Sequence, residues 1–379
     1  MVVAILSLIA GGGLLLVGAE SLVRGASKLA GLMGIPPLII GLTIVAYGTS
    51  APELAVSLQS TLGGQGDIAL GNVIGSNIFN VLMILGISAL VAPLRVAQQL
   101  IRLDVPIMIG ISGLMILFAL DRTLQSSDGI ILVTGSVVYT LFLLYQSRKE
   151  TDVDVQAEYE LEYGTKSKVK LAWLYNVSFL GLGAVTLVMG SRLFVAGAIE
   201  IAEAVGVSQI VIGLTVVAMG TSLPELATSM VATFRGERDI AVGNVVGSNI
   251  FNLLTVIGIA ALTSTGGLAI PPAVINFDLP IMLAVAVACI PIFVTGNVIS
   301  RWEGFLFVGY YVAYATFLIL RAADHEHLEI FSRVMLLFVI PITVITLVTV
   351  MARYWPRRHQ EDDADSKESS VLPRDTHGR

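Results

Sequence analysis

The stretch GLTIVAYGTSAPELAVS (residues 41–57) is the centre around which this chain is organised, because it places a carboxylate, Glu53, inside an otherwise apolar segment. Nearly the same letters, GLTVVAMGTSLPELATS, return at residues 213–229, where Glu225 takes the position of Glu53. A charge at bilayer depth costs several kcal/mol, roughly 2.5–3.5 on insertion scales, so it rarely lies there without a function. Two such acids in matched sequence indicate one shared role.

Composition identifies the chain as a polytopic membrane protein. Of 379 residues, 55% are hydrophobic and 13% are charged, and the mean hydropathy is +0.85, values outside the range of soluble domains. The charged residues concentrate in one central segment and at the C-terminus, and nothing in this pattern favours nucleic-acid binding. Cys289 is the only cysteine, which excludes disulfides and cysteine-rich metal sites. The N-terminus lacks the features of a signal peptide and is interpreted as a first helix.

Apolar runs of about 20 residues, the length that crosses a bilayer, predict the membrane spans. Five runs precede a polar linker (148–170), five follow it, and one more precedes a charged tail (354–379) that we expect to be disordered. The predicted spans cover residues 2–23, 37–61, 68–92, 104–120, 128–147, 171–200, 208–233, 240–264, 276–298, 303–322 and 334–351.

The duplication extends beyond the opening stretch, since LDVPIM (103–108) matches FDLPIM (277–282). Each copy contains five predicted spans, and an odd number of crossings places the two copies in opposite orientations. This is the inverted-repeat architecture of secondary transporters. We therefore predict an all-α membrane protein with ten core helices in two inverted five-helix repeats (1–147 and 171–322) and an additional C-terminal transmembrane helix (323–353).

Basic residues between the spans predict the orientation. With the N-terminus outside, most of the arginines and lysines between spans fall in the cytoplasm, whereas the outside keeps Arg122, Arg321 and Arg333. We therefore predict that the N-terminus is outside, that the linker 148–170 is cytoplasmic, and that the protein lies in the cell (plasma or inner) membrane. An eleventh span would place the basic residues that follow it in the cytoplasm. The distribution of basic residues therefore favours an eleventh span.

The opening stretch collects oxygen atoms around its acid. Thr49, Ser50 and Glu53 stand at helical spacing and share one side of adjacent turns. Pro52 removes a backbone hydrogen bond and bends the helix, which frees carbonyl oxygens, and the carbonyl of Ala46 is placed to turn inward as well. The second copy repeats every element: Ala218, Thr221, Ser222, Pro224 and Glu225.

A second motif follows each acid: DIALGNVIGSNIFN (67–80) and DIAVGNVVGSNIFN (239–252). Helical spacing places Asn72, Ser76 and Asn80 on one face. Their counterparts are Asn244, Ser248 and Asn252. The first asparagine of each set fits an ion ligand as well as it fits an interhelical hydrogen bond. The small-xxx-small glycines of each motif indicate close helix packing.

The combined inventory of two carboxylates, hydroxyls, carboxamides and carbonyls suits a hard cation such as Ca²⁺, which takes 6–8 oxygen ligands, or Na⁺. Two carboxylates balance one Ca²⁺ or two Na⁺, so competition for the same charges is a physical basis for exchange. Protons are an alternative, because a membrane-embedded glutamate can bind them instead. A zinc hydrolase lacks its ligands, since all four histidines lie outside the predicted spans and no HExxH motif occurs. A channel is a further alternative class.

GTSAPEL with GNVIGSNIFN, and GTSLPEL with GNVVGSNIFN, closely resemble the two alpha repeats of the calcium/cation antiporter superfamily, in its prokaryotic-type sodium/calcium exchanger branch. The resemblance implies a ten-helix antiporter without catalytic residues or cofactors, with ions at the centre of the second, third, seventh and eighth helices. It implies that Glu53 and Glu225 are calcium ligands, aided by the carbonyls of Ala46 and Ala218. The implied sodium ligands are Thr49, Ser50, Ser76, Thr221, Ser222 and Ser248.

One departure from the family pattern is informative. Some relatives, including potassium-dependent exchangers, carry aspartate at the position of Asn252, whereas this chain has Asn80 and Asn252 in its two halves. We include both asparagines in the predicted site and expect potassium-independent, electrogenic exchange of Na⁺ for Ca²⁺ by alternating access. The alternative is a proton-coupled calcium or manganese antiporter on the same fold.

Overall fold

The computed structural model of the protein describes residues 1–147, 166–207, 212, 215–216 and 218–349. Most of the predicted linker, the predicted tail and much of the first half of the predicted seventh span lie outside these residues. Within them, nine helices are long and apolar enough to cross a membrane, and a bent helix pair supplies a tenth span. The prediction of an all-α polytopic membrane protein is confirmed.

The first repeat follows the predicted order of spans. Its elements are α1 (Val2–Met33); α2 (Pro37–Ile40), the π-helix η1 (Gly41–Val45), α3 (Ala46–Thr49) and α4 (Ala51–Leu62); α5 (Gly66–Phe79), the π-helix η2 (Asn80–Leu85) and α6 (Gly86–Val91); the π-helix η3 (Leu100–Asp104), α7 (Val105–Phe118) and the 3₁₀ turn η4 (Ala119–Asp121); and α8 (Ser126–Ser147).

The second repeat and the C-terminal helix follow the same order. Their elements are α10 (Lys166–Ala204); α12 (Ala218–Gly220) and α13 (Leu223–Phe234); α14 (Arg238–Phe251), the π-helix η6 (Asn252–Val256) and α15 (Ile257–Thr263); the π-helix η7 (Val274–Asp278) and α16 (Leu279–Val294); α17 (Arg301–Ala322); and α18 (Leu328–Val334) with the π-helix η8 (Met335–Val339), in a helical span that continues to Thr349.

Two short antiparallel ladders join the repeats to each other. β1 (Leu94–Arg95) pairs with β4 (Val298–Ile299), and β2 (Thr123–Leu124) pairs with β3 (Leu268–Ala269). The members of each ladder must lie on the same side of the membrane, so an even number of crossings must separate them. The predicted order of five spans in each repeat meets this condition for both ladders.

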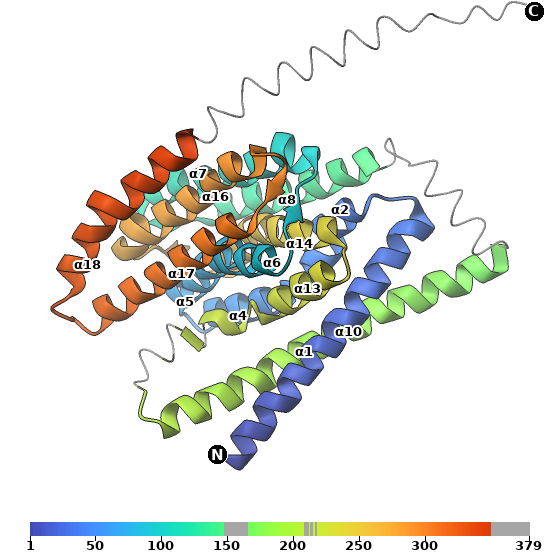
Figure 1. The fold of residues 1–379 in the computed structure, drawn as a ribbon, viewed down its shortest axis with the longest axis horizontal. Helices are drawn as coiled ribbons and strands as arrows, with labels where there is room; N and C mark the ends of the chain where they lie inside the picture. The colour runs from blue at the N-terminus through green and yellow to red at the C-terminus, as the bar shows by residue number, and fades with distance from the viewer. Residues whose placement is uncertain (148–165, 208–211, 213–214, 217, 350–379) are drawn as a thin grey trace, which may run out of the picture.

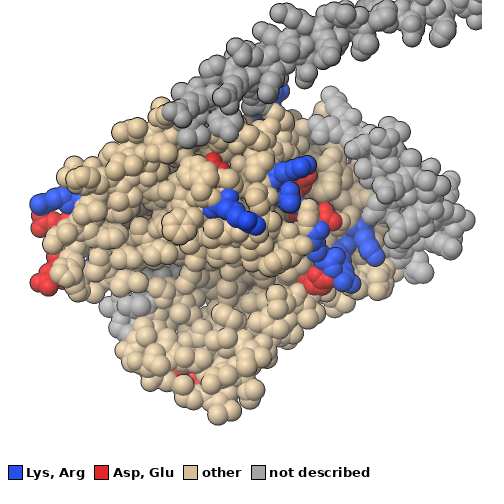
Figure 2. Space-filling view, viewed as in Figure 1, with Lys and Arg blue, Asp and Glu red and all other residues tan. Residues whose placement is uncertain are grey.

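α1 and α10 cross each other along one side of the helix bundle (Figure 1). Glycines seven residues apart allow the two backbones to touch: Gly11, Gly18 and Gly25 in α1, and Gly183, Gly190 and Gly197 in α10. A Cβ on Gly190 would lie 2.8 Å from the backbone nitrogen of Leu15, closer than van der Waals contact permits. Figure 2 shows few charged side chains on the lower lobe of the surface, where the N-terminal half of α1 lies, whereas charged side chains gather toward the C-terminal end of α1. The uncharged part suits contact with hydrocarbon, where a charged side chain is costly.

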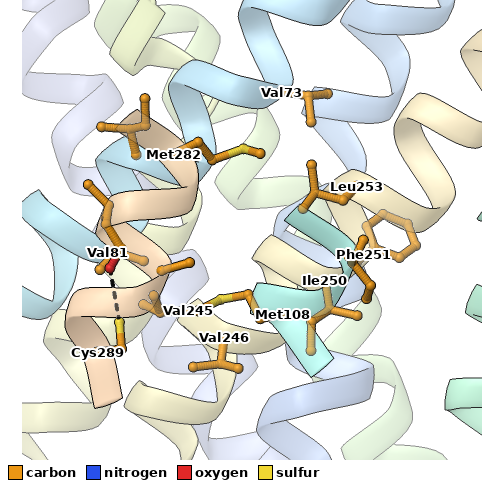
Figure 3. Packing of buried hydrophobic residues seen from close by; sticks show 14 of the residues in the cluster. Val73, Val81, Met108, Val245, Val246, Ile250, Phe251, Leu253, Met282 and Cys289 are labelled. Atoms are coloured by element: carbon orange, nitrogen blue, oxygen red, sulfur yellow. Dashed lines mark hydrogen bonds between the residues drawn. The ribbon is translucent and has the colours of Figure 1, made fainter. Parts of the chain in front are cut away.

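The helices that carry the GNV motifs form the centre of the molecule. In the spans Gly66–Val91 and Arg238–Thr263, 78% and 83% of the most apolar window is buried. Apolar side chains from α14 pack there with Met108 and Met282 (Figure 3). Cys289 is fully buried in the same cluster and donates to the carbonyl of Val285. This cysteine is therefore part of the apolar packing.

The C-terminal span Leu328–Thr349 differs from this centre, since none of its apolar window is buried. The phenol of Tyr310 on α17 donates to Thr343 Oγ1 at 2.7 Å and attaches this helix to the bundle. An apolar cavity of about 540 Å³ lies between the helix and α16 and α17. The predicted additional helix is therefore present as a peripheral element.

Candidate ion-binding site

Each predicted acid lies in the first turn of a half-helix. The second span bends by 44° between α3 and α4, where Ser50 leaves helical geometry with φ −84° and ψ 8°. Ser222 has nearly the same angles before α13. The proline-associated break predicted in the first repeat is confirmed. Unpaired N–H groups and the positive end of the helix dipole therefore lie beside Glu53 and Glu225, which favours negative charge there.

A serine from each repeat binds the acid of the other repeat. Ser50 Oγ donates to Glu225 Oε1 at 2.8 Å, and Ser222 Oγ donates to Glu53 Oε1 at 3.1 Å. Ser76 Oγ lies 3.5 Å from the same oxygen of Glu53. All five side chains are fully buried. The two acids that the duplication predicted are thus joined in one cross-linked cluster.

The threonines form a second pair of links between the repeats. Thr49 Oγ1 donates to Asn244 Oδ1, and Thr221 Oγ1 donates to Asn72 Oδ1, both at 3.0 Å. The amide nitrogen of each asparagine donates to a serine on the helix of the acid in its own repeat, Ser57 for Asn72 and Ser229 for Asn244, again at 3.0 Å. Asn72 and Asn244 therefore make interhelical hydrogen bonds, one of the two roles that the sequence left open, and their role as ion ligands stays a prediction.

Several oxygen atoms at this centre are buried and have no hydrogen-bond partner among the described residues. Burying a polar atom without a partner costs about 1–3 kcal/mol, and more for a charged one, so such atoms are rare unless a ligand pairs with them. In the predicted site they are Glu53 Oε2, Glu225 Oε2, Asn80 Oδ1, Asn252 Oδ1 and Ser248 Oγ. They are carboxylate, carboxamide and hydroxyl oxygens, the donor types that hard cations prefer.

The remaining predicted ligands are the two alanine carbonyls. The carbonyl of Ala46 accepts from the Ser50 N–H at 3.0 Å and from Thr49 Oγ1 at 3.3 Å, so it is engaged within its own helix. Ala218 begins α12, and its side chain lies outside the described part of the chain. The ligand role of every predicted residue remains a prediction.

Two residues of this centre were missed from the sequence. Asn77 and Asn249 are almost fully buried and make hydrogen bonds between the repeats. The signal was available, because both belong to the GSN triplet that is identical in the two copies. No group of three or more His, Cys, Asp or Glu side chains with metal-binding geometry occurs in the described residues. Amides and hydroxyls therefore supply most of the polar atoms of the centre.

Two acids outside this centre have structural roles. Asp104 is fully buried and makes no side-chain cap for the following helix. It accepts instead from the phenol of Tyr139 at 2.9 Å, and Asp278 accepts from Tyr314 at 3.0 Å. No cap forms at Asp104 because α7 continues directly from the π-helical turn that ends at this residue.

Inverted repeats with broken helices, whose acids and hydroxyls meet at a buried centre, define a secondary transporter of cations. A family model described as sodium/calcium exchanger protein matches residues 3–147 and 175–320. The chain therefore belongs to the sodium/calcium exchanger family, whose members are membrane antiporters rather than enzymes and use the transported ions without a cofactor.

Individual relatives agree with this assignment. The sodium/calcium exchanger MaX1 of Methanosarcina acetivorans is 31% identical over 78% of this chain and 93% of its own length. The inner membrane protein YrbG of Escherichia coli is 40% identical over 73% of this chain and 84% of its own length. The structure of a sodium/calcium exchanger from Methanococcus jannaschii superposes with a TM-score of 0.70 at 26% identity, covering 83% of this chain and 98% of that one.

Proposed function

We propose that this protein exchanges Na⁺ for Ca²⁺ across the cell membrane by alternating access. The observation that carries the proposal is the set of unpaired, buried oxygens on Glu53, Glu225, Asn80, Asn252 and Ser248. A cation supplies the missing partner for each of these atoms, and the flexible, many-oxygen coordination of Ca²⁺ suits them. The names of the exchangers from the two methanogens support the choice of ions.

Charge balance suggests how the two ions compete. The centre holds two carboxylates, which balance one Ca²⁺ or two Na⁺. Asn80 and Asn252 add oxygen ligands without charge, and for this reason we propose that K⁺ is not transported. Any sodium bound beyond two adds net positive charge to that step, so exchange with more than two Na⁺ per Ca²⁺ is electrogenic.

The glycine contact between α1 and α10 supports the proposal that these two helices move together. Both helices lie beside the bundle (Figure 1), and we propose that they slide against the buried centre to open the site to each side in turn. Their polar contacts with the centre are few enough to exchange: Ser191 Oγ with the carbonyl of Gly220 and Ser27 Oγ with Glu237 are two of them.

Reconstituted proteoliposomes test the choice of coupling ion. Vesicles loaded with Na⁺ and diluted into Na⁺-free medium should take up ⁴⁵Ca²⁺, and dissipating the Na⁺ gradient should stop the uptake. A membrane potential that is positive inside should accelerate uptake if more than two Na⁺ leave per Ca²⁺. Uptake driven equally well by a proton gradient without Na⁺ would instead establish the proton-coupled alternative, and Mn²⁺ competition would then identify its substrate.

The same vesicles distinguish a carrier from a channel. Exchange should saturate with Ca²⁺ and require a counter-ion, whereas single-channel currents would contradict the proposal. Orientation needs a separate measurement. We propose that the N-terminus is outside and the 148–170 linker is cytoplasmic, so a single cysteine introduced in this linker into a Cys289→Ala protein should resist an impermeant thiol reagent in intact cells.

A further inference from the structure

The two asparagines of the GSN triplets hold each other across the centre of the molecule. Asn77 Nδ2 donates to the carbonyl of Asn249, and Asn249 Nδ2 donates to the carbonyl of Asn77, both at 3.2 Å. One residue lies on α5 and the other on α14. The bonds are therefore reciprocal between the repeats and fix the position of both side chains.

Each of these asparagines also binds a predicted ligand of the opposite repeat. Asn80 Nδ2 donates to Asn249 Oδ1 at 3.0 Å, and Asn252 Nδ2 donates to Asn77 Oδ1 at 3.1 Å. A carboxamide presents an amino group on one side and an oxygen on the other. Since the amino groups of Asn80 and Asn252 are held, their Oδ1 atoms are the ones left unpaired.

Helix spacing places Asn80 on the side of its helix that approaches an acid. Asn80 is one helical turn beyond Ser76, whose hydroxyl approaches Glu53, and residues four apart share a helix face. The surroundings of Asn77 and Asn249 are apolar on the other side, where Met282 and Met108 lie among packed side chains (Figure 3). An unpaired polar group is expensive among buried apolar side chains, so the amide orientation is costly to reverse.

We propose that Asn77 and Asn249 are positioning residues that turn the amide oxygens of Asn252 and Asn80 toward the transported cation. The inference rests on the proposed binding of Ca²⁺ and Na⁺ at this centre and names residues outside the predicted ligand set. Without the acceptor on Asn77, the Asn252 amide is free to present its NH₂ group to the site. An NH₂ group repels a cation, so the affinity falls although every ligand residue is still present.

A double-mutant cycle separates this role from simple packing. Ca²⁺ binding to the purified full chain is measured by calorimetry for the wild type, Asn77→Leu, Asn252→Asp and the double variant. We expect Asn77→Leu to weaken Ca²⁺ binding about tenfold in the wild-type background. In the Asn252→Asp background both side-chain atoms are oxygens and no wrong orientation exists, so Asn77→Leu should change the affinity less than about twofold. An equal loss in both backgrounds would show a merely structural role and overturn the inference.

A conservative variant guards against misfolding. Asn77→Asp retains an acceptor for the amino group of Asn252 and should keep Ca²⁺ affinity at or above that of the wild type, whereas a tenfold loss would contradict the proposal. Asn249→Leu with Asn80→Asp repeats the cycle in the other half. If the wild type binds neither Ca²⁺ nor Na⁺, the proposed function fails. If it binds Ca²⁺ and Asn77→Leu binds it equally well, only the positioning role fails.

Discussion

Two of the contacts between matched helices of the repeats are built from opposite chemistry. α1 and α10 meet through glycines, backbone against backbone, and a polar link between them lies at an exposed end, where the Met1 amino group contacts Glu200. α5 and α14 meet through asparagines that donate to each other's carbonyls in a buried centre. Packing therefore holds the matched helices together at the α1–α10 contact, whereas hydrogen bonds hold them together at the α5–α14 contact.

The difference teaches which helices are free to move. The glycine contact holds α1 and α10 to each other by close van der Waals packing, and this packing leaves no buried hydrogen bond to break when the two helices move together. The amide bonds between α5 and α14 have fixed donors and acceptors, and a shift leaves buried amides unpaired. The predicted ion ligands lie beside the second contact, so directional bonds fix their geometry, whereas the α1–α10 pair is the part that we propose to slide against them.

The largest expected effect comes from removing charge at the amide-bonded centre. Glu53→Gln and Glu225→Gln each leave one carboxylate to balance Ca²⁺, so we expect Na⁺-driven ⁴⁵Ca²⁺ uptake into proteoliposomes to fall more than about 100-fold, since each 1.4 kcal/mol of lost binding is a factor of ten. Glu329→Gln serves as the control, because this acid is 81% exposed and pairs with Arg333 on the peripheral helix. Near-normal uptake by either site variant would place the ions elsewhere.

The glycine contact should be sensitive to a single methyl group. In Gly190→Ala the new Cβ would lie 2.8 Å from the backbone nitrogen of Leu15, and such overpacking costs about 1–3 kcal/mol. We expect a lower melting temperature in detergent and slower exchange. Gly181→Ala, in the same helix but with no atom within 4 Å of its Cβ, is the matched control. Equal behaviour of the two variants would show that α1 and α10 do not touch there.

A smaller effect is expected at the buried aspartate of the first repeat. Tyr139→Phe removes the phenol that donates to Asp104, and hydrogen bonds in membrane proteins are worth about 0.6 kcal/mol on average and at most about 1.7. The melting temperature should fall modestly. Tyr314→Phe removes the matching bond to Asp278, which is half-buried, so its effect should be the weaker one. The reverse ranking would contradict the burial argument.

The smallest effect is expected where α1 meets the end of α13. Arg235 forms an ion pair with Glu20, and both side chains are 35% exposed. Exposed pairs contribute about 0–1 kcal/mol and are screened by salt. Arg235→Gln should therefore shift the melting temperature by little, and the shift should shrink between 0.05 and 0.5 M NaCl, about 14 and 4 Å of Debye length. A large, salt-independent loss would mean that the pair locks α1 to the bundle.

The sequence predicted most of this centre because the duplication marks it. Residues that recur in both copies, such as Ser50 with Ser222 and Asn80 with Asn252, were assigned to the site and lie fully buried. The hydrogen-bond partner of each residue could not be predicted. A motif does not tell which serine faces which acid once one copy is inverted. The bond from Ser50 to Glu225 rather than to its neighbour Glu53 arises only from the packing of the repeats.

Helix ends were predicted less well than helix identities. The first span was predicted to end at residue 23, whereas α1 continues to Met33. Hydropathy reports the part of a helix that lies in hydrocarbon, and α1 extends past it with a more polar segment that carries Arg24 and Ser27. The predicted seventh span can be compared with the structure mainly from residue 218 onward. The predicted boundaries between the two repeats and the 148–170 linker stay predictions.

The two strand ladders have a consequence for how the protein is made. Leu94, on one membrane face, can pair with Ile299 only after the chain between them has been synthesised. The same holds for the strand pair of Leu124 and Leu268. The first repeat therefore leaves the ribosome with open backbone edges on both faces of the membrane. Assembly completes when the second repeat is inserted upside down beside it, so a truncated chain is expected to be recognised as unfinished by membrane quality control.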